Sequence, residues 1–94
     1  MYGTCARMKV KAENRQKLRD LIQGQEYTSV QGFVRSFVLY ENDGDVAWLF
    51  AVFSDRATYE KNADDPAQDA RYQEYRALLE EDPEWHDGEI THSS

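Results

Sequence analysis

The chain has 94 residues, of which 40% are hydrophobic and 31% charged, and its formal net charge is -7 at pH 7. A chain of this length has material for one hydrophobic core, so we expect a single domain over residues 1–94. The negative charge repels phosphate backbones and anionic lipid, and no stretch reaches the roughly 20 apolar residues of a membrane span. We therefore expect neither nucleic acid nor membrane as a partner, and a cytoplasmic location because no secretory signal is recognisable.

The first part of the chain predicts a strand and then a helix. Residues 2–11 alternate between two sets of side chains, which is the period of a β-strand. Residues 13–25 place Leu18, Leu21 and Ile22 at helical spacing among charged and amide side chains.

Two long β-rich runs follow, residues 30–42 and residues 45–54. They are joined by Asp43-Gly44, a pair that tolerates the positive φ angles of a two-residue type I′ turn. The pattern predicts a β-hairpin.

The second half predicts a helix in two pieces and a last strand. Asp55 can cap a short helix to about Ala63, and Asp65-Pro66-Ala67-Gln68 opens another in the manner of a capping box. That helix should end near Asp82, because Pro83 cannot continue it. A final strand then begins at residue 84 or 88 and ends near residue 92. The order β, α, β, β, α, β predicts an α+β fold of the ferredoxin-like kind, an antiparallel sheet with helices on one face.

The hairpin carries apolar side chains on both of its faces. With the turn at Asp43-Gly44, paired positions place Leu39 opposite Trp48 and Phe37 opposite Phe50. One predicted face holds Phe33, Arg35, Phe37, Leu39, Trp48, Phe50 and Val52. The other holds Val34, Ser36, Val38, Tyr40, Ala47, Leu49, Ala51 and Phe53. Helices on one side cover only one face, so we expect a second copy to cover the other in a two-fold homodimer. A long C-terminal strand or a different partner protein is the alternative.

Three stretches of the chain resemble one known family. The stretches are residues 48–62, the helix that begins at Pro66, and residues 83–90, Pro-Glu-Trp-His-Asp-Gly-Glu-Ile. They resemble the antibiotic biosynthesis monooxygenase-like family of dimeric α+β barrels. The resemblance implies a pocket between the sheet and the helices of each subunit. Members that act on haem carry a Trp at the position of Asn62 and an iron-binding His at the position of Tyr72. This chain has neither, so we expect no haem and no other cofactor. Haem degradation with the Tyr72 phenolate as iron ligand, an uncommon ligation, is the remaining alternative.

The resemblance also suggests which residues line the pocket. Quinol-oxidising relatives use Asn, Trp and Tyr, which this chain can supply from Asn62, Trp48, Tyr59, Tyr72 and Tyr75. We predict Asn62 and Tyr72 as catalytic groups that position and polarise substrate oxygens, and the other three as substrate-binding. The open alternatives are structural: Asn62 as a helix C-cap, the tyrosines as a core stripe, and Trp48 as sheet packing.

Four further residues could carry chemistry. Arg35 is a cation on an apolar face, and it either pairs or stacks across the dimer or binds a substrate anion. Cys5 is the only cysteine and is predicted to be a small buried filler. His86 and His92 would stand about 20 Å apart along one strand, too far to share a metal, so no metal site is expected.

These observations support two functions. The first is a cofactor-independent, monooxygenase-like protein that acts on a small aromatic or quinol-type ligand. The second is a non-catalytic, dimeric ligand-binding or accessory protein of the same fold.

Overall fold

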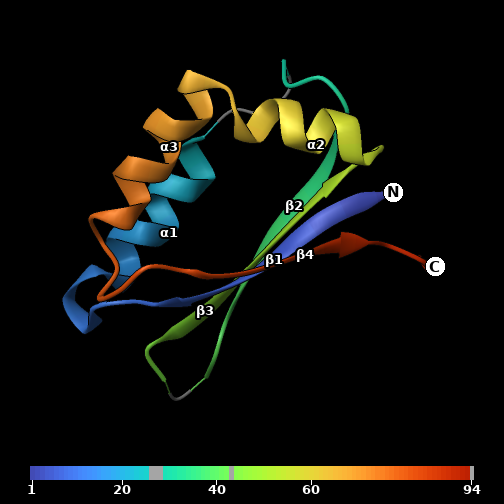
Figure 1. The fold of residues 1–94 in the computed structure, drawn as a ribbon. Coiled ribbons are helices and arrows are strands. Elements are labelled where there is room, and N and C mark those ends of the chain that lie inside the picture. Colours follow the sequence, from blue (N-terminus) through green and yellow to red (C-terminus); the bar gives the residue numbers. More distant parts are fainter. Residues whose placement is uncertain (26–28, 43, 94) are drawn as a thin grey trace.

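The computed structural model describes residues 1–25, 29–42 and 44–93, which form one sheet with helices on one side (Figure 1). Within these residues the strands are β1 (Tyr2–Lys9), β2 (Phe33–Tyr40), β3 (Val46–Phe53) and β4 (Glu84–Glu89). The helices are a 3-10 turn (Ala12–Asn14), α1 (Arg15–Gly24), α2 (Arg56–Ala63) and α3 (Pro66–Arg76). The sheet order is β2-β3-β1-β4 and all neighbouring strands are antiparallel. The predicted ferredoxin-like fold class is confirmed.

The register of the hairpin is the predicted one over most of its length. Leu39 lies opposite Trp48, and Phe37 lies opposite Phe50. The predicted turn includes Asp43, which lies outside the described residues. Because side chains alternate along a strand, this register decides which residues face the helices.

The start of β2 departs from the prediction. An irregularity between Phe33 and Arg35 shifts the register, so that Phe33 pairs with Phe53. The Phe33 ring consequently lies on the helix side, 5.8 Å from the ring of Phe53, while Val34 is 51% exposed on the other side. The predicted faces of Phe33 and Val34 were wrong, because a bulge inserts one residue and reverses the alternation before it.

Helix α3 ends at Arg76, earlier than the predicted end near Asp82. The chain leaves the helix so that Leu79 forms a β-bridge with Val10 and becomes buried. β4 also ends earlier than expected, at Glu89. None of the helices in the described part of the chain is long and apolar enough to cross a bilayer.

The hydrophobic core occupies one end of the space between sheet and helices. Its members come from β1, β3, α1, α3 and the segment after α3: Met8, Val10, Leu18, Ala47, Tyr75 and Leu79. α1 and α3 lie over this end, and α2 covers the other (Figure 1). The core therefore fills only part of the layer, which leaves room for a cavity beside it.

Candidate functional site

A cavity of about 380 Å³ lies between the sheet and the helices. This volume falls in the usual range for small-molecule pockets, about 300–1,000 Å³. Strand residues that line it are Thr4, Phe33, Ser36, Leu49, Ala51, Phe53 and Trp85. Helix and loop residues that line it are Ile22, Gln25, Tyr59, Asn62, Ala63, Gln68, Asp69, Tyr72 and Tyr75. The cavity is therefore mostly apolar, with hydroxyl and amide groups that come mainly from α2 and α3.

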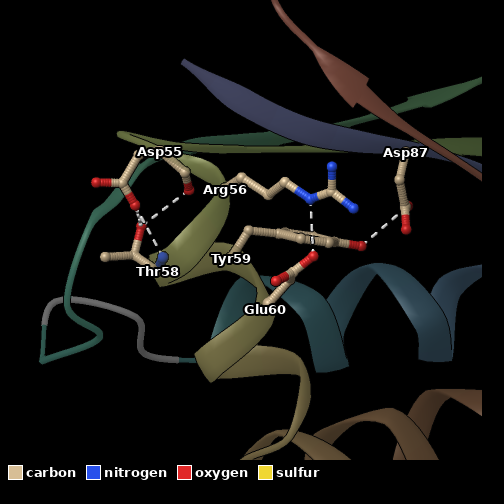
Figure 2. A network of polar contacts seen from close by, with 6 residues as sticks. All are labelled: Asp55, Arg56, Thr58, Tyr59, Glu60 and Asp87. Atoms are coloured by element: carbon tan, nitrogen blue, oxygen red, sulfur yellow. Dashed lines mark hydrogen bonds and ion pairs between the residues drawn. The ribbon is translucent and has the colours of Figure 1, made fainter.

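Two local features fix α2 over the sheet. The Asp55 carboxylate accepts hydrogen bonds from the Thr58 backbone N–H at 2.8 Å and from the Thr58 hydroxyl at 2.9 Å, which caps the helix (Figure 2). The backbone bond from Thr58 is the main reason that the pKa of Asp55 is lowered. Gly32, with φ of 80°, packs against Thr58 so closely that an added Cβ would overlap the threonine side chain. The predicted N-cap role of Asp55 is confirmed.

Tyr59 extends from α2 toward β4. Its ring centroid lies 5.3 Å from that of Tyr2 and 5.6 Å from that of Phe53. Its hydroxyl donates a hydrogen bond of 2.9 Å to Asp87 Oδ1 on β4 (Figure 2). Burial, followed by this hydrogen bond, raises the pKa of Tyr59 to about 12. Tyr59 is therefore a neutral phenol at physiological pH.

Aromatic rings from α3 and β4 form another part of the lining. The rings of Tyr72 and Tyr75 meet edge to face with centroids 5.3 Å apart, and Tyr72 lies 6.1 Å from Trp85. Tyr75 belongs to the core and is 3% exposed, whereas Trp85 is 41% exposed. A flat ligand could contact Tyr72 and Trp85 without disturbing the core.

Four of the six residues predicted for the pocket line this cavity: Asn62, Tyr59, Tyr72 and Tyr75. Asn62 is half-buried within α2, whose C-cap is Asp64, so the interpretation of Asn62 as a C-cap was wrong. Tyr75 serves the core as well, as its structural alternative proposed. The catalytic and binding roles of these residues stay predictions.

Arg35 and Trp48 do not line the cavity. Arg35 borders a groove on the opposite face of the sheet, together with Phe37 and Phe50. Trp48, which lies opposite Leu39 on that face, donates a hydrogen bond of 2.8 Å from Nε1 to Glu41 Oε2. The alternation of the hairpin placed both residues on one face correctly, but nothing in the sequence decided which face the helices cover.

Sequence reasoning missed several lining residues, of which Trp85 is the largest. Trp85 pairs with Ala6 across β4 and β1, and Ala6 is buried on the helix side. A correct prediction of where β4 begins, and of its register against β1, would have placed Trp85 in the cavity lining. Asp69 was also missed, and among the described lining residues it is the only carboxylate; none of them is Lys, Arg or His.

No protein-family model and no curated protein matches this sequence, whereas many solved structures match its fold. A variant of SnoaB, a cofactor-independent oxygenase from Streptomyces nogalater, is 19% identical with a TM-score of 0.83, over 98% of this chain and 94% of that chain. A candidate antibiotic biosynthesis monooxygenase from Deinococcus radiodurans is 13% identical with a TM-score of 0.81, over 100% and 96%. Rv0793 from Mycobacterium tuberculosis is 16% identical with a TM-score of 0.81, over 99% and 97%. The chain has the fold of the antibiotic biosynthesis monooxygenase-like family.

In this monooxygenase-like fold the helices leave the outer face of the sheet uncovered (Figure 1). On that face Phe37 stacks on Phe50 at 4.7 Å, yet Phe37 and Leu39 remain 51% and 52% exposed. Cys5 lines the same face and is only partly buried, so its prediction as a small buried filler was wrong. Its position on β1 points the thiol away from the helices, because the buried neighbours Thr4 and Ala6 occupy the opposite side.

Proposed function

We propose that this chain is a cofactor-independent, monooxygenase-like protein that acts on a small aromatic or quinol-type ligand. The observation that carries the proposal is the cavity of about 380 Å³ that is lined by Asn62, Tyr59 and Tyr72 together with the aromatic ring of Trp85. The fold shared with a cofactor-independent oxygenase supports it. Fold alone does not determine chemistry, so the proposal depends on the site.

The lining residues suit the steps that such a reaction needs. The Asn62 amide can donate a hydrogen bond to an oxygen that gains negative charge, and the Tyr72 hydroxyl can orient a second oxygen. In a ring methylene, one oxygen atom of O₂ replaces both hydrogens as a carbonyl and the other leaves as water, so the substrate supplies every electron. The residues then act by binding and orienting the substrate and by stabilising its anion.

The alternative is a non-catalytic ligand-binding or accessory protein. One observation favours it: the described lining offers a single candidate base, the exposed carboxylate of Asp69, and no histidine or lysine. Asp69 is the only carboxylate there, and Tyr59 stays protonated because its pKa is raised to about 12.

We also propose that the protein is a homodimer joined through the outer face of the sheet. Val34, Phe37 and Leu39 are each about half exposed there, at 51%, 51% and 52%. Exposed apolar patches of this kind mark interaction surfaces, and a two-fold axis would bring two such faces together.

Oxygen uptake tests the catalytic proposal directly. Purified protein should consume O₂ with at least one member of a panel of hydroquinones and hydroxyanthrones. Asn62→Ala should lower turnover by about 10²- to 10³-fold, as loss of one oxyanion donor does elsewhere. Gln73→Ala, on the exposed side of α3, is the matched control and should leave the rate unchanged. Saturable binding without any uptake across the panel would favour the non-catalytic alternative.

A further inference from the structure

The hydrogen bond between Tyr59 and Asp87 fixes which way the phenol proton points. A carboxylate accepts hydrogen bonds and donates none, so in the 2.9 Å contact the Tyr59 hydroxyl must be the donor (Figure 2). The hydroxyl proton of Tyr59 therefore points at the Asp87 carboxylate on β4 and not at the cavity. What the phenol oxygen can still offer the cavity is a lone pair.

Neighbouring groups leave that lone pair available. A phenol oxygen can accept a hydrogen bond as well as donate one. The Thr4 hydroxyl, which also lines the cavity, donates to the backbone oxygen of His86 at 3.4 Å. The Tyr59 ring is held in place by the rings of Tyr2 and Phe53, whose centroids lie 5.3 Å and 5.6 Å from its own. Tyr59, which lines the cavity, therefore carries an acceptor held in a fixed position beside β4.

No cation offsets this acceptor within the described lining. Arg56 lies on the same helix but is exposed, and its Nε donates to Glu60 at 2.8 Å (Figure 2). Its guanidinium carbon lies 5.6 Å from the ring centroid of Tyr2. A carbonyl, ether or carboxylate oxygen placed against the Tyr59 oxygen would face a lone pair, with no positive charge in the described lining to neutralise the repulsion. A hydroxyl group would instead donate to it.

We propose that Tyr59 determines specificity in this cavity, with Asp87 as its positioning residue, by selecting ligands that present a hydroxyl donor to the Tyr59 oxygen. The inference rests on the proposed ligand-binding function and adds which ligand oxygen each of these two α2 side chains, Tyr59 and Asn62, accepts. Asn62, which can donate, takes an oxygen that gains charge, and Tyr59 takes one that stays protonated.

The test compares two ligands that differ by one methyl group, 1-naphthol and 1-methoxynaphthalene, by titration calorimetry. Wild-type protein should bind 1-naphthol about tenfold more tightly, the effect of one net hydrogen bond. Tyr59→Phe keeps the ring and its aromatic contacts, and should reduce the ratio to about one. In Asp87→Asn the amide can donate to the phenol oxygen and release its proton toward the ligand, so the ratio should fall below about threefold.

Glu84→Gln is the matched control, because it removes a carboxylate from the same strand at a residue that pairs with His86 rather than Tyr59. It should keep the tenfold preference. Equal affinity of wild type for the two ligands, or a tenfold preference that survives in Tyr59→Phe, would overturn the role of Tyr59. A preference lost in Tyr59→Phe but unchanged in Asp87→Asn would overturn the positioning by Asp87. Failure of wild type to bind either ligand would overturn the proposed aromatic site itself, and this inference with it.

Discussion

Placing a charge at Phe50 should separate the proposed dimer. Phe50 stacks on Phe37 at 4.7 Å in the centre of the uncovered face. Half of a phenylalanine side chain is about 100 Å² of apolar surface, so covering Val34, Phe37 and Leu39 contributes on the order of 5 kcal/mol per subunit at about 25 cal/mol per Å². Phe50→Asp would bury an unpaired carboxylate in each subunit at a cost of about 3–5 kcal/mol. The dissociation constant of the dimer should rise by at least about a hundredfold.

Light scattering after size-exclusion chromatography measures this change. Wild type should elute with a mass near twice the 11.0 kDa chain, and Phe50→Asp near the mass of one chain. Gln73→Glu adds the same charge on the exposed side of α3 and should remain dimeric. A monomeric wild type at micromolar concentration would refute the interpretation of the outer face as an interface.

Three further predictions concern the scaffold and Tyr59. Leu79→Ala should lower the free energy of unfolding by about 2–5 kcal/mol in urea titrations, because Leu79 is 2% exposed and its loss leaves a cavity. Asp55→Ala should lower the thermal midpoint at neutral pH but not in acid. Because folding lowers the pKa of Asp55, its carboxylate stabilises the folded state at pH values above the pKa of the unfolded chain. This stabilisation is lost as the pH falls through the pKa of Asp55 in the folded protein. An equal loss at both pH values would contradict this. Spectrophotometric titration should show one tyrosine ionising near pH 12 that is missing in Tyr59→Phe, and an unchanged titration curve would count against the buried phenol.

The order of elements and the hairpin register could be predicted because both depend on local patterns. Alternation over two long strands fixes pairs such as Phe37 with Phe50, whatever lies above the sheet. The bulge at Val34 could not be foreseen, because the residues of the irregularity, Phe33 to Arg35, include no glycine or proline, and Gly32 before them is equally typical of an ordinary turn into a strand. The early end of α3 was equally hidden, since it depends on Leu79 meeting Val10, which is distant along the chain.

The site was only half predictable for a related reason. Asn62, Tyr59 and Tyr72 lie on helices whose inward faces can be read from spacing, and they do line the cavity. Trp48 and Trp85 lie on strands, where alternation separates two faces without saying which one the helices cover. In the observed topology Trp85 faces the helices and lines the cavity, whereas Trp48 lies on the outer face of the sheet.

That difference between the two tryptophans allows a direct test of the central claim that the cavity binds an aromatic ligand. In Trp48→Phe protein Trp85 is the only tryptophan, and it reports from the lining of the cavity. Titration with a naphthoquinone should quench its fluorescence saturably, with one ligand per chain. The same titration of Trp85→Phe protein, in which only Trp48 emits, should show no saturable quenching. Quenching that persists without Trp85, or none in the Trp48→Phe protein, would contradict the assignment of the site.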